Sequence, residues 1–200
     1  MIDPYNITDF SRSRSDLEEF WLFCLAVAGK KATVIADKVA EFLKDAEEGE
    51  TPFAYVRRLW SESTLRDRLK GVRLGKYALL EKAYSASVAD AAPDLTTATA
   101  EDLESIPGVG PKTARFFILH SRKDARVAVI DTHVLKYLRM LGHSVPKGVP
   151  SGREYKRLEE IMLSEMDKSG MPRAEFDLAV WSHFASNGAS PLPGTGTRVS

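Results

Sequence analysis

The stretch Ile106–Ala114 reads Ile-Pro-Gly-Val-Gly-Pro-Lys-Thr-Ala, and it decides the fold of the chain. A helical pattern over 99–105 runs into its two glycines, and a second helical pattern starts directly after them. Glycine lets the backbone take a positive φ and approach a ligand closely, and free N–H groups at a helix start attract anions. We therefore expect a helical hairpin whose Gly108, Gly110 and following N–H groups bind a phosphate without reading sequence. A tight helix–helix turn without a ligand is the alternative.

An amine and a carboxylate accompany this hairpin. Lys112 lies in the first turn of the second helix, where its amine can contact phosphate or act as a nucleophile that forms a Schiff base. Asp131 follows nineteen residues later, directly after the apolar run Ala125–Ile130 and before another helical pattern. We expect Asp131 to cap that helix, and its carboxylate can also accept a proton or stabilise a positively charged sugar. The combination predicts chemistry at a sugar carbon.

Composition narrows the class of protein. The chain has 200 residues, 44% of them hydrophobic, which suffices for one large domain or two small lobes. The formal net charge is zero, but Lys and Arg concentrate in 57–82 and 108–147, and acids in 37–50, 90–104 and 154–175. This segregation favours an anion-binding face, and ordinary solvated helix faces explain it equally well. Cys24 is the only cysteine, so we expect a buried structural thiol and no disulfide, thiolate-held zinc or iron–sulfur cluster.

The ends and hydropathy of the chain predict a cytoplasmic protein. No stretch approaches the roughly 20 apolar residues that a membrane-spanning helix needs. The N-terminus, Met1–Pro4, lacks the basic and apolar segments of a secretion signal. The four histidines are scattered and indicate no metal site, and His120 and His143 are expected at the surface or at an interface.

The pattern is helical nearly throughout, which predicts an all-α protein. Ser15 and Glu18 form a capping-box pattern for the first helix, and Thr99 and Asp102 form one for a short helix before the hairpin. The run Ala125–Ile130 is the only strand signal. One expected helix runs to about Ala28, a second has Val34, Ile35, Val39, Phe42 and Leu43 on one face, and a short third one follows Thr99. Further expected helices cover about 53–60, 64–69, 76–88, 112–121, 132–141, 151–168 and 173–185, and the linker-like stretch 91–99 suggests two lobes.

Together these residues resemble the helix-hairpin-helix (HhH-GPD) DNA glycosylase superfamily, which includes endonuclease III and the 8-oxoguanine glycosylases. The resemblance covers most of the chain and is strongest over Leu103–Gly142, which holds the Lys-to-Asp spacing and the Val-x-Asp-x-His-like Val129–His133. It implies a single domain over 1–200 with a DNA-binding and active-site cleft between two lobes. One lobe centres on about 30–95, the second combines 1–29 with 96–186 and carries the hairpin 103–121, and the tail 187–200 is flexible.

The resemblance also implies an activity. In that family the hairpin lysine attacks C1′ of the damaged nucleotide and the aspartate activates it, and Lys112 and Asp131 match those positions. Members that only excise bases typically lack the lysine, so Lys112 implies base excision followed by strand nicking through β-elimination. Without a four-cysteine loop or an N-terminal β-rich domain, the chain resembles the compact 8-oxoguanine glycosylase/lyases. The expected partner is double-stranded DNA that contains a damaged base, bound by a monomer.

Further residues follow from the same resemblance. Leu69–Tyr77 resembles a loop that inserts a wedge into the duplex, with Val72–Leu74 as the candidate wedge residues, and Gly29–Lys31 resembles a turn that fills the gap left by the extruded base. Phe116, Asp177 and Trp181 are candidates for the base pocket, with a structural role as the alternative for each. No cofactor is expected, apart from a K⁺ or Na⁺ ion at the hairpin carbonyls. The expected DNA contacts are Gly108, Gly110, Thr113, His133, Lys30, Lys31, Val72, Arg73, Leu74 and Lys76.

Two other functions stay open. One is a glycosylase for another lesion, such as an oxidised or modified pyrimidine. The other is a non-catalytic helix-hairpin-helix module that only binds DNA. The pairing of Lys112 with Asp131 disfavours the module, because phosphate binding alone needs no carboxylate.

Overall fold

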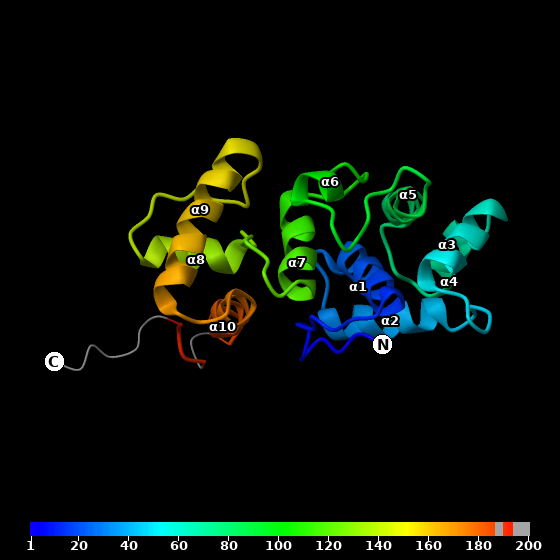
Figure 1. Cartoon of the computed structure of the whole chain (residues 1–200), viewed down its shortest axis with the longest axis horizontal. Helices are drawn as coiled ribbons and strands as arrows, with labels where there is room; N and C mark the ends of the chain where they lie inside the picture. The colour runs from blue at the N-terminus through cyan, green and yellow to red at the C-terminus, as the bar shows by residue number, and fades with distance from the viewer. Residues whose placement is uncertain (187–189, 194–200) are drawn as a thin grey trace. The chain divides into compact units, whose positions relative to one another are not determined.

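The structure is a computed structural model of the chain, and it describes residues 1–186 and 190–193. Within them the chain is all-helical, as the sequence predicts (Figure 1). No helix there is both long and apolar enough to cross a membrane. The helices are α1 (Arg14–Val27), α2 (Ala32–Leu43), α3 (Pro52–Ser61), α4 (Leu65–Gly71), α5 (Tyr77–Ser87), α6 (Ala100–Glu104), α7 (Pro111–Ser121), α8 (Thr132–Met140), α9 (Gly152–Ser169) and α10 (Arg173–Ala185).

The strand signal at Ala125–Ile130 does not produce a strand, since this segment forms no strand or bridge in the part of the chain that the structure describes. Its backbone N–H groups bond instead to side chains of α9. Ala128 N donates to Glu159 Oε1 at 3.1 Å, and Ile130 N donates to the Tyr155 hydroxyl at 2.9 Å. Buried N–H groups need acceptors, and here a helix supplies them.

The start of α1 also differs from the expected one. Ser13 is the cap, and its Oγ accepts from Asp16 N at 3.2 Å. The predicted Ser15–Glu18 capping box is therefore wrong. Glu18 is buried, and its Oε2 accepts from Phe53 N at the start of α3, at 3.0 Å. A tertiary contact thus takes the carboxylate that a local cap would have used.

The chain divides into two compact units, Met1–Phe117 (unit 1) and Ile118–Ser200 (unit 2), and α7 contains the boundary. In unit 1, α1 is buried along most of its length and packs against α2, α3 and α5. Trp21 meets the edge of Phe117 at a ring-centroid distance of 5.0 Å and donates from Nε1 to Ser87 Oγ at 2.8 Å. Cys24 is buried, as expected, and burial raises the pKa of its thiol.

Unit 2 packs α8, α9 and α10 around a core of its own. Tyr155 and Phe176 are fully enclosed, and Leu192 packs against this core from beyond α10. His183 Nδ1 lies 2.6 Å from the Ser190 carbonyl oxygen, so this part of the predicted flexible tail returns to α10. Residues 187–189 and 194–200 of the tail lie outside the described residues. The predicted grouping of residues 1–29 with 96–186 in one lobe stays a prediction.

Candidate nucleic-acid interface and active site

The hairpin joins α6 to α7 through a tight turn. Thr99 and Asp102 form the predicted capping box at the start of α6. After α6, Val109 N donates to the Ile106 carbonyl at 3.0 Å, and Gly108, the third residue of this turn, has φ +85°. A proline followed by a residue with positive φ is the pattern of a type II turn. A Cβ on Gly108 would lie 2.4 Å from Leu79 Cδ1, so both conformation and space require glycine there.

Gly110 has a different reason to be glycine. Its φ is not positive, and a Cβ added to it would meet nothing within 4 Å. The expectation of a positive φ is thus correct for Gly108 and wrong for Gly110. What Gly110 provides is open space directly in front of α7.

The start of α7 presents unsatisfied donors to that space. The first N–H groups of a helix have no acceptor within the helix. In the described part of the chain, the N–H groups of Gly110, Lys112 and Thr113 have no acceptor, and Pro111 has no N–H group. The Lys112 side chain is exposed. An anion can therefore be bound by two to three backbone donors, the helix dipole and one ammonium group.

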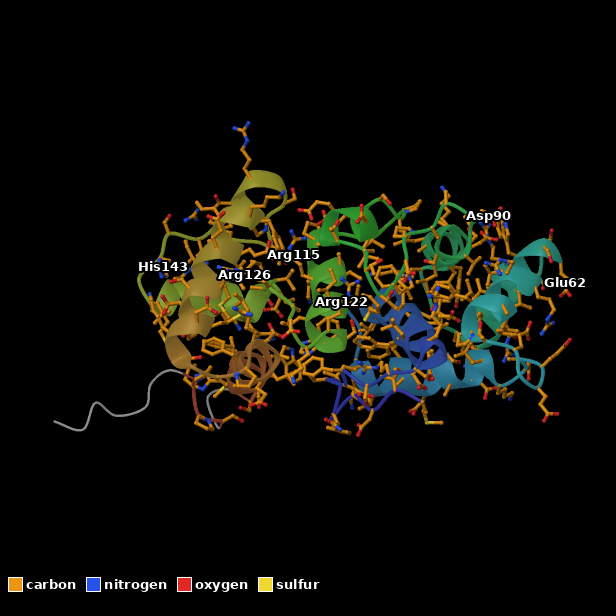
Figure 2. All side chains as sticks on the ribbon, viewed as in Figure 1. Glu62, Asp90, Arg115, Arg122, Arg126 and His143 are labelled. Atoms are coloured by element: carbon orange, nitrogen blue, oxygen red, sulfur yellow. The ribbon has the colours of Figure 1, made fainter. Side chains whose placement is uncertain are left out.

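Arg115 links the two helices of the hairpin through ion pairs. This buried guanidinium, seen on α7 in Figure 2, lies with Nη1 2.6 Å from Glu104 Oε1 and Nη2 3.6 Å from Glu101 Oε1 on α6. Arg115 counts among the basic residues of 108–147, yet its charge is neutralised inside the protein. It stabilises the hairpin and is not free to bind DNA.

Asp131 caps α8, as predicted. Its Oδ1 accepts from His133 N at 2.8 Å and from Val134 N at 2.9 Å, and the side chain is buried to 9% exposure. Its second oxygen, Oδ2, accepts no hydrogen bond from the described residues. The cap therefore orients the carboxylate and leaves one oxygen for chemistry. Lys112 belongs to unit 1 and Asp131 to unit 2.

His133 and Trp181 come together in unit 2. The His133 ring meets the Trp181 ring edge-on, with centroids 6.1 Å apart, and the Phe184 ring in a stacked arrangement at 6.4 Å. Trp181 remains 53% exposed. The Nδ1 atom of His133 is buried and has no hydrogen-bond partner in the part of the chain that the structure describes. A predicted DNA contact and a predicted pocket residue thus share one aromatic patch at the start of α8.

Asp177 is paired inside unit 2. Its Oδ2 lies 3.3 Å from Nε2 of His120, and both side chains are buried. Of the two positions expected for His120, surface or interface, the surface is excluded, because the side chain is buried and Asp177 of α10 pairs with it. The pairing favours the structural role for Asp177 that the sequence left open.

Phe116 is half-buried in unit 1 and packs against Phe20 of α1, with ring centroids 6.2 Å apart. Part of its surface therefore belongs to the core of unit 1. Its role in a base pocket stays a prediction.

The two candidate insertion loops of unit 1, residues 28–31 and 72–76, contact each other. Val72 and Leu74 are buried at 8% and 1% exposure, so neither side chain is presented to a duplex. Of the predicted wedge residues only Arg73 is exposed, and it has φ +57°. Lys30 donates to the Leu74 carbonyl, and Lys76 donates to the Ala28 carbonyl at 3.0 Å.

Half of the eight basic residues of 57–82 are neutralised by carboxylates within the protein. Carboxylates pair with Arg58, Arg66, Arg68 and Lys70, and Arg57 donates to the Val88 carbonyl. Arg73, Lys76 and Lys82 make no ion pair with any described residue. Lys38 of α2 belongs to the same group as Arg73 and Lys76, because its Nζ donates to the Arg73 carbonyl. No sequence signal singled out Lys38, since its partners lie 35 residues away in the chain.

Within the described residues, no group of three or more His, Cys, Asp or Glu side chains is placed to hold a metal ion.

Comparison with known proteins agrees with this geometry. Residues 93–116 match the family described as helix-hairpin-helix motif. The 8-oxoguanine glycosylase/lyase of Methanocaldococcus jannaschii, solved with a 15mer DNA containing 8-oxoguanine, aligns with a TM-score of 0.62 and 19% identity over 92% of this chain and 88% of that one. The 8-oxoguanine DNA glycosylase of Thermotoga maritima, Tm1821, aligns with a TM-score of 0.58 and 20% identity over 94% and 88%. The chain thus has a helix-hairpin-helix motif set in the fold of the 8-oxoguanine DNA glycosylases, as the sequence resemblance predicts.

Proposed function

We propose that the protein is a bifunctional DNA glycosylase/AP lyase that removes an oxidised base from double-stranded DNA, with 8-oxoguanine as the preferred substrate. The observation that carries this proposal is the open start of α7 with exposed Lys112 in its first turn, within the fold of known 8-oxoguanine glycosylases. A phosphate held by these N–H groups would place DNA backbone beside the amine.

Lys112 supplies the nucleophile. The lone pair of a neutral Nζ forms a bond to C1′ as the bond from C1′ to the base breaks, and the base leaves with that electron pair and takes up a proton. Ring opening gives a Schiff base between Lys112 and the sugar. Loss of a C2′ proton then expels the 3′ phosphate, which nicks the strand.

Asp131 supplies the carboxylate. The bond to the base breaks through a transition state in which C1′ and the ring oxygen carry positive charge, and a fixed carboxylate stabilises that charge. Oδ1 is held by the two N–H groups of α8, so Oδ2 is the oxygen that would face the sugar or take a proton from the Lys112 amine. The reaction requires both side chains to reach the same nucleotide.

The hairpin would also hold a K⁺ or Na⁺ ion between protein and phosphate. The carbonyl groups of Pro107, Gly108 and Val109 accept no hydrogen bond from the described backbone, and carbonyl oxygens are ligands that such hard cations prefer. The residues present therefore fit the ion, which would supply additional positive charge next to the phosphate.

The test is excision under single-turnover conditions on matched duplexes that contain 8-oxoguanine, thymine glycol, uracil or an alkylated purine. We expect the fastest nicking with 8-oxoguanine and none by Lys112→Gln. Lys44→Gln is the matched control, because it removes the same charge from an exposed lysine of unit 1 that pairs with Glu41, and we expect wild-type rates. Faster excision of thymine glycol would assign the protein to another lesion. Duplex binding without excision of any of these bases would identify a DNA-binding module.

A further inference from the structure

Three lysines of unit 1 tie two loops together. Lys30 donates to the Leu74 carbonyl, Lys38 to the Arg73 carbonyl, and Lys76 to the Ala28 carbonyl. The first and third bonds run in opposite directions between residues 28–31 and residues 72–76, and α2 supplies the second. The three ammonium groups are therefore gathered around one pair of loops.

No carboxylate neutralises this group, which we call the lysine cluster (Lys30, Lys38 and Lys76). None of the three makes an ion pair with a described residue, whereas four of the five basic residues of neighbouring α3 and α4 pair with carboxylates. Burial and the like charges of Lys76 and Lys38 lower the pKa of Lys30. Like charges held together without a counter-ion destabilise the free protein, and a bound anion would offset that repulsion.

The backbone around the lysine cluster is held in an uncommon conformation. Arg73 and Lys76 have φ +57° and +50°, in the left-handed region that side chains other than those of Gly, Asn and Asp rarely adopt. Such conformations persist where surrounding contacts impose them, and they concentrate at functional sites. Here the bonds from Lys38 to the Arg73 carbonyl and from Lys76 to the Ala28 carbonyl are those contacts.

The ammonium groups keep donors for a ligand. Each ammonium has three N–H donors, and each one spends a single donor on a carbonyl. Lys31 and Arg73, both exposed, add positive charge at the edge of the lysine cluster. Several cations with spare donors and no carboxylate match a phosphate, which offers several acceptor oxygens and full negative charge.

We propose that the lysine cluster is a second phosphate-binding site, separate from the start of α7, and that it takes one phosphodiester group of duplex DNA. This inference rests on the proposed function only in taking DNA as the ligand. The two loops would then bind the DNA backbone through charge, while the buried Val72 and Leu74 side chains fix the shape of the loop from inside.

The test compares two triple variants with the same change in net charge. One is Lys30→Gln/Lys38→Gln/Lys76→Gln, and the matched control is Lys44→Gln/Lys70→Gln/Lys82→Gln on exposed lysines of the same unit. Binding of an undamaged duplex is measured by fluorescence anisotropy across a salt series. Each phosphate contact contributes about −0.9 to the slope of log K against log salt. We expect the magnitude of the slope to fall by about 1 in the first variant and to stay unchanged in the control.

Equal slopes in the two variants, whether reduced or unchanged, would overturn the proposal. A thermal-unfolding experiment in inorganic phosphate against chloride at equal ionic strength identifies the ligand. If phosphate raises the Tm of the wild type more than that of the cluster variant while the DNA slopes are the same, the site takes free phosphate, and DNA as its ligand is refuted.

Two features keep the experiment decisive. If the triple variant does not fold, Lys38→Gln is compared with Lys44→Gln at the C-cap of the same helix, and the same difference in slope is expected. Because the duplex carries no lesion, the result does not depend on base excision, so failure of the proposed activity and failure of this site are distinguishable.

Discussion

The starts of α7 and α8 satisfy their backbone in opposite ways. At α8 the chain places Asp131, whose Oδ1 accepts from two N–H groups and closes the helix start. At α7 the chain places Gly110 and Pro111, and the N–H groups of the first turn are left without an acceptor in the described residues. One helix start is thus completed by the protein, and the other keeps donors that a ligand can use. We propose that this ligand is a DNA phosphate.

The largest effect is expected from changing Asp131, which caps the start of α8. Asp131→Asn keeps a capping oxygen but loses the charge, so we expect duplex binding and stability close to wild type and excision slower by about 100-fold or more. Asp131→Ala should show the same loss of activity and also lose about 1 kcal/mol of stability, because the cap is gone. Single-turnover kinetics and urea unfolding measure the two effects. Full activity in Asp131→Asn would leave the carboxylate with a structural role only.

A capping side chain at position 110 should give α7 the same kind of capped start that α8 has. Gly110→Asp places a capping carboxylate in front of α7, where a Cβ meets nothing within 4 Å. We expect unfolding free energy to rise by a few tenths of a kcal/mol and duplex affinity to fall by about tenfold, since charge and oxygen occupy the phosphate position. Gly110→Asn, which caps without charge, should fall between this variant and the wild type. Unchanged affinity in Gly110→Asp would show that DNA does not bind there.

Gly108→Ala should damage the turn and not the anion site. The positive φ and the 2.4 Å approach of its Cβ to Leu79 Cδ1 predict a loss of about 1–3 kcal/mol in unfolding free energy. Gly110→Ala, which meets neither obstacle, should change stability by less than about 1 kcal/mol. Chemical denaturation of the two variants side by side separates the roles of the glycines, and equal losses would contradict the separation.

The smallest effect is expected at α6. Thr99 and Asp102 cap its start, and we propose no catalytic role for this helix. Thr99→Ala removes the Oγ that accepts from Asp102 N at 3.1 Å, and we expect a loss of about 1 kcal/mol in stability. Excision rate and duplex affinity should not change at a temperature where the variant is folded. A loss of activity without a loss of stability would mean that α6 acts on the site more directly.

Local hydrogen bonding explains what could be predicted from the sequence. The cap at Asp131, the capping box of α6 and the turn at Gly108 depend on residues within four positions of one another, so spacing reveals them. The start of α1 could not be resolved in this way, because Ser13 and Ser15 are each followed three residues later by an acid. The Phe53 N–H group binds Glu18 and thereby decides in favour of Ser13.

Long-range contacts account for the rest. Charge counting placed Arg115 in a basic block, and only the fold shows that Glu104 and Glu101 neutralise it. The strand signal at Ala125–Ile130 ends in three buried residues, 128–130, but the partners of the Ala128 and Ile130 N–H groups are side chains of α9. The lysine cluster joins segments that are more than 30 residues apart in the chain, so no local pattern announces it.

Borohydride trapping on an 8-oxoguanine duplex, followed by peptide mapping of the adduct, shows whether the amine at the open start of α7 is the nucleophile. We predict a covalent protein–DNA adduct in the wild type, located on Lys112, and none in Lys112→Gln. An adduct on a different lysine, or trapping that survives in Lys112→Gln, would contradict it.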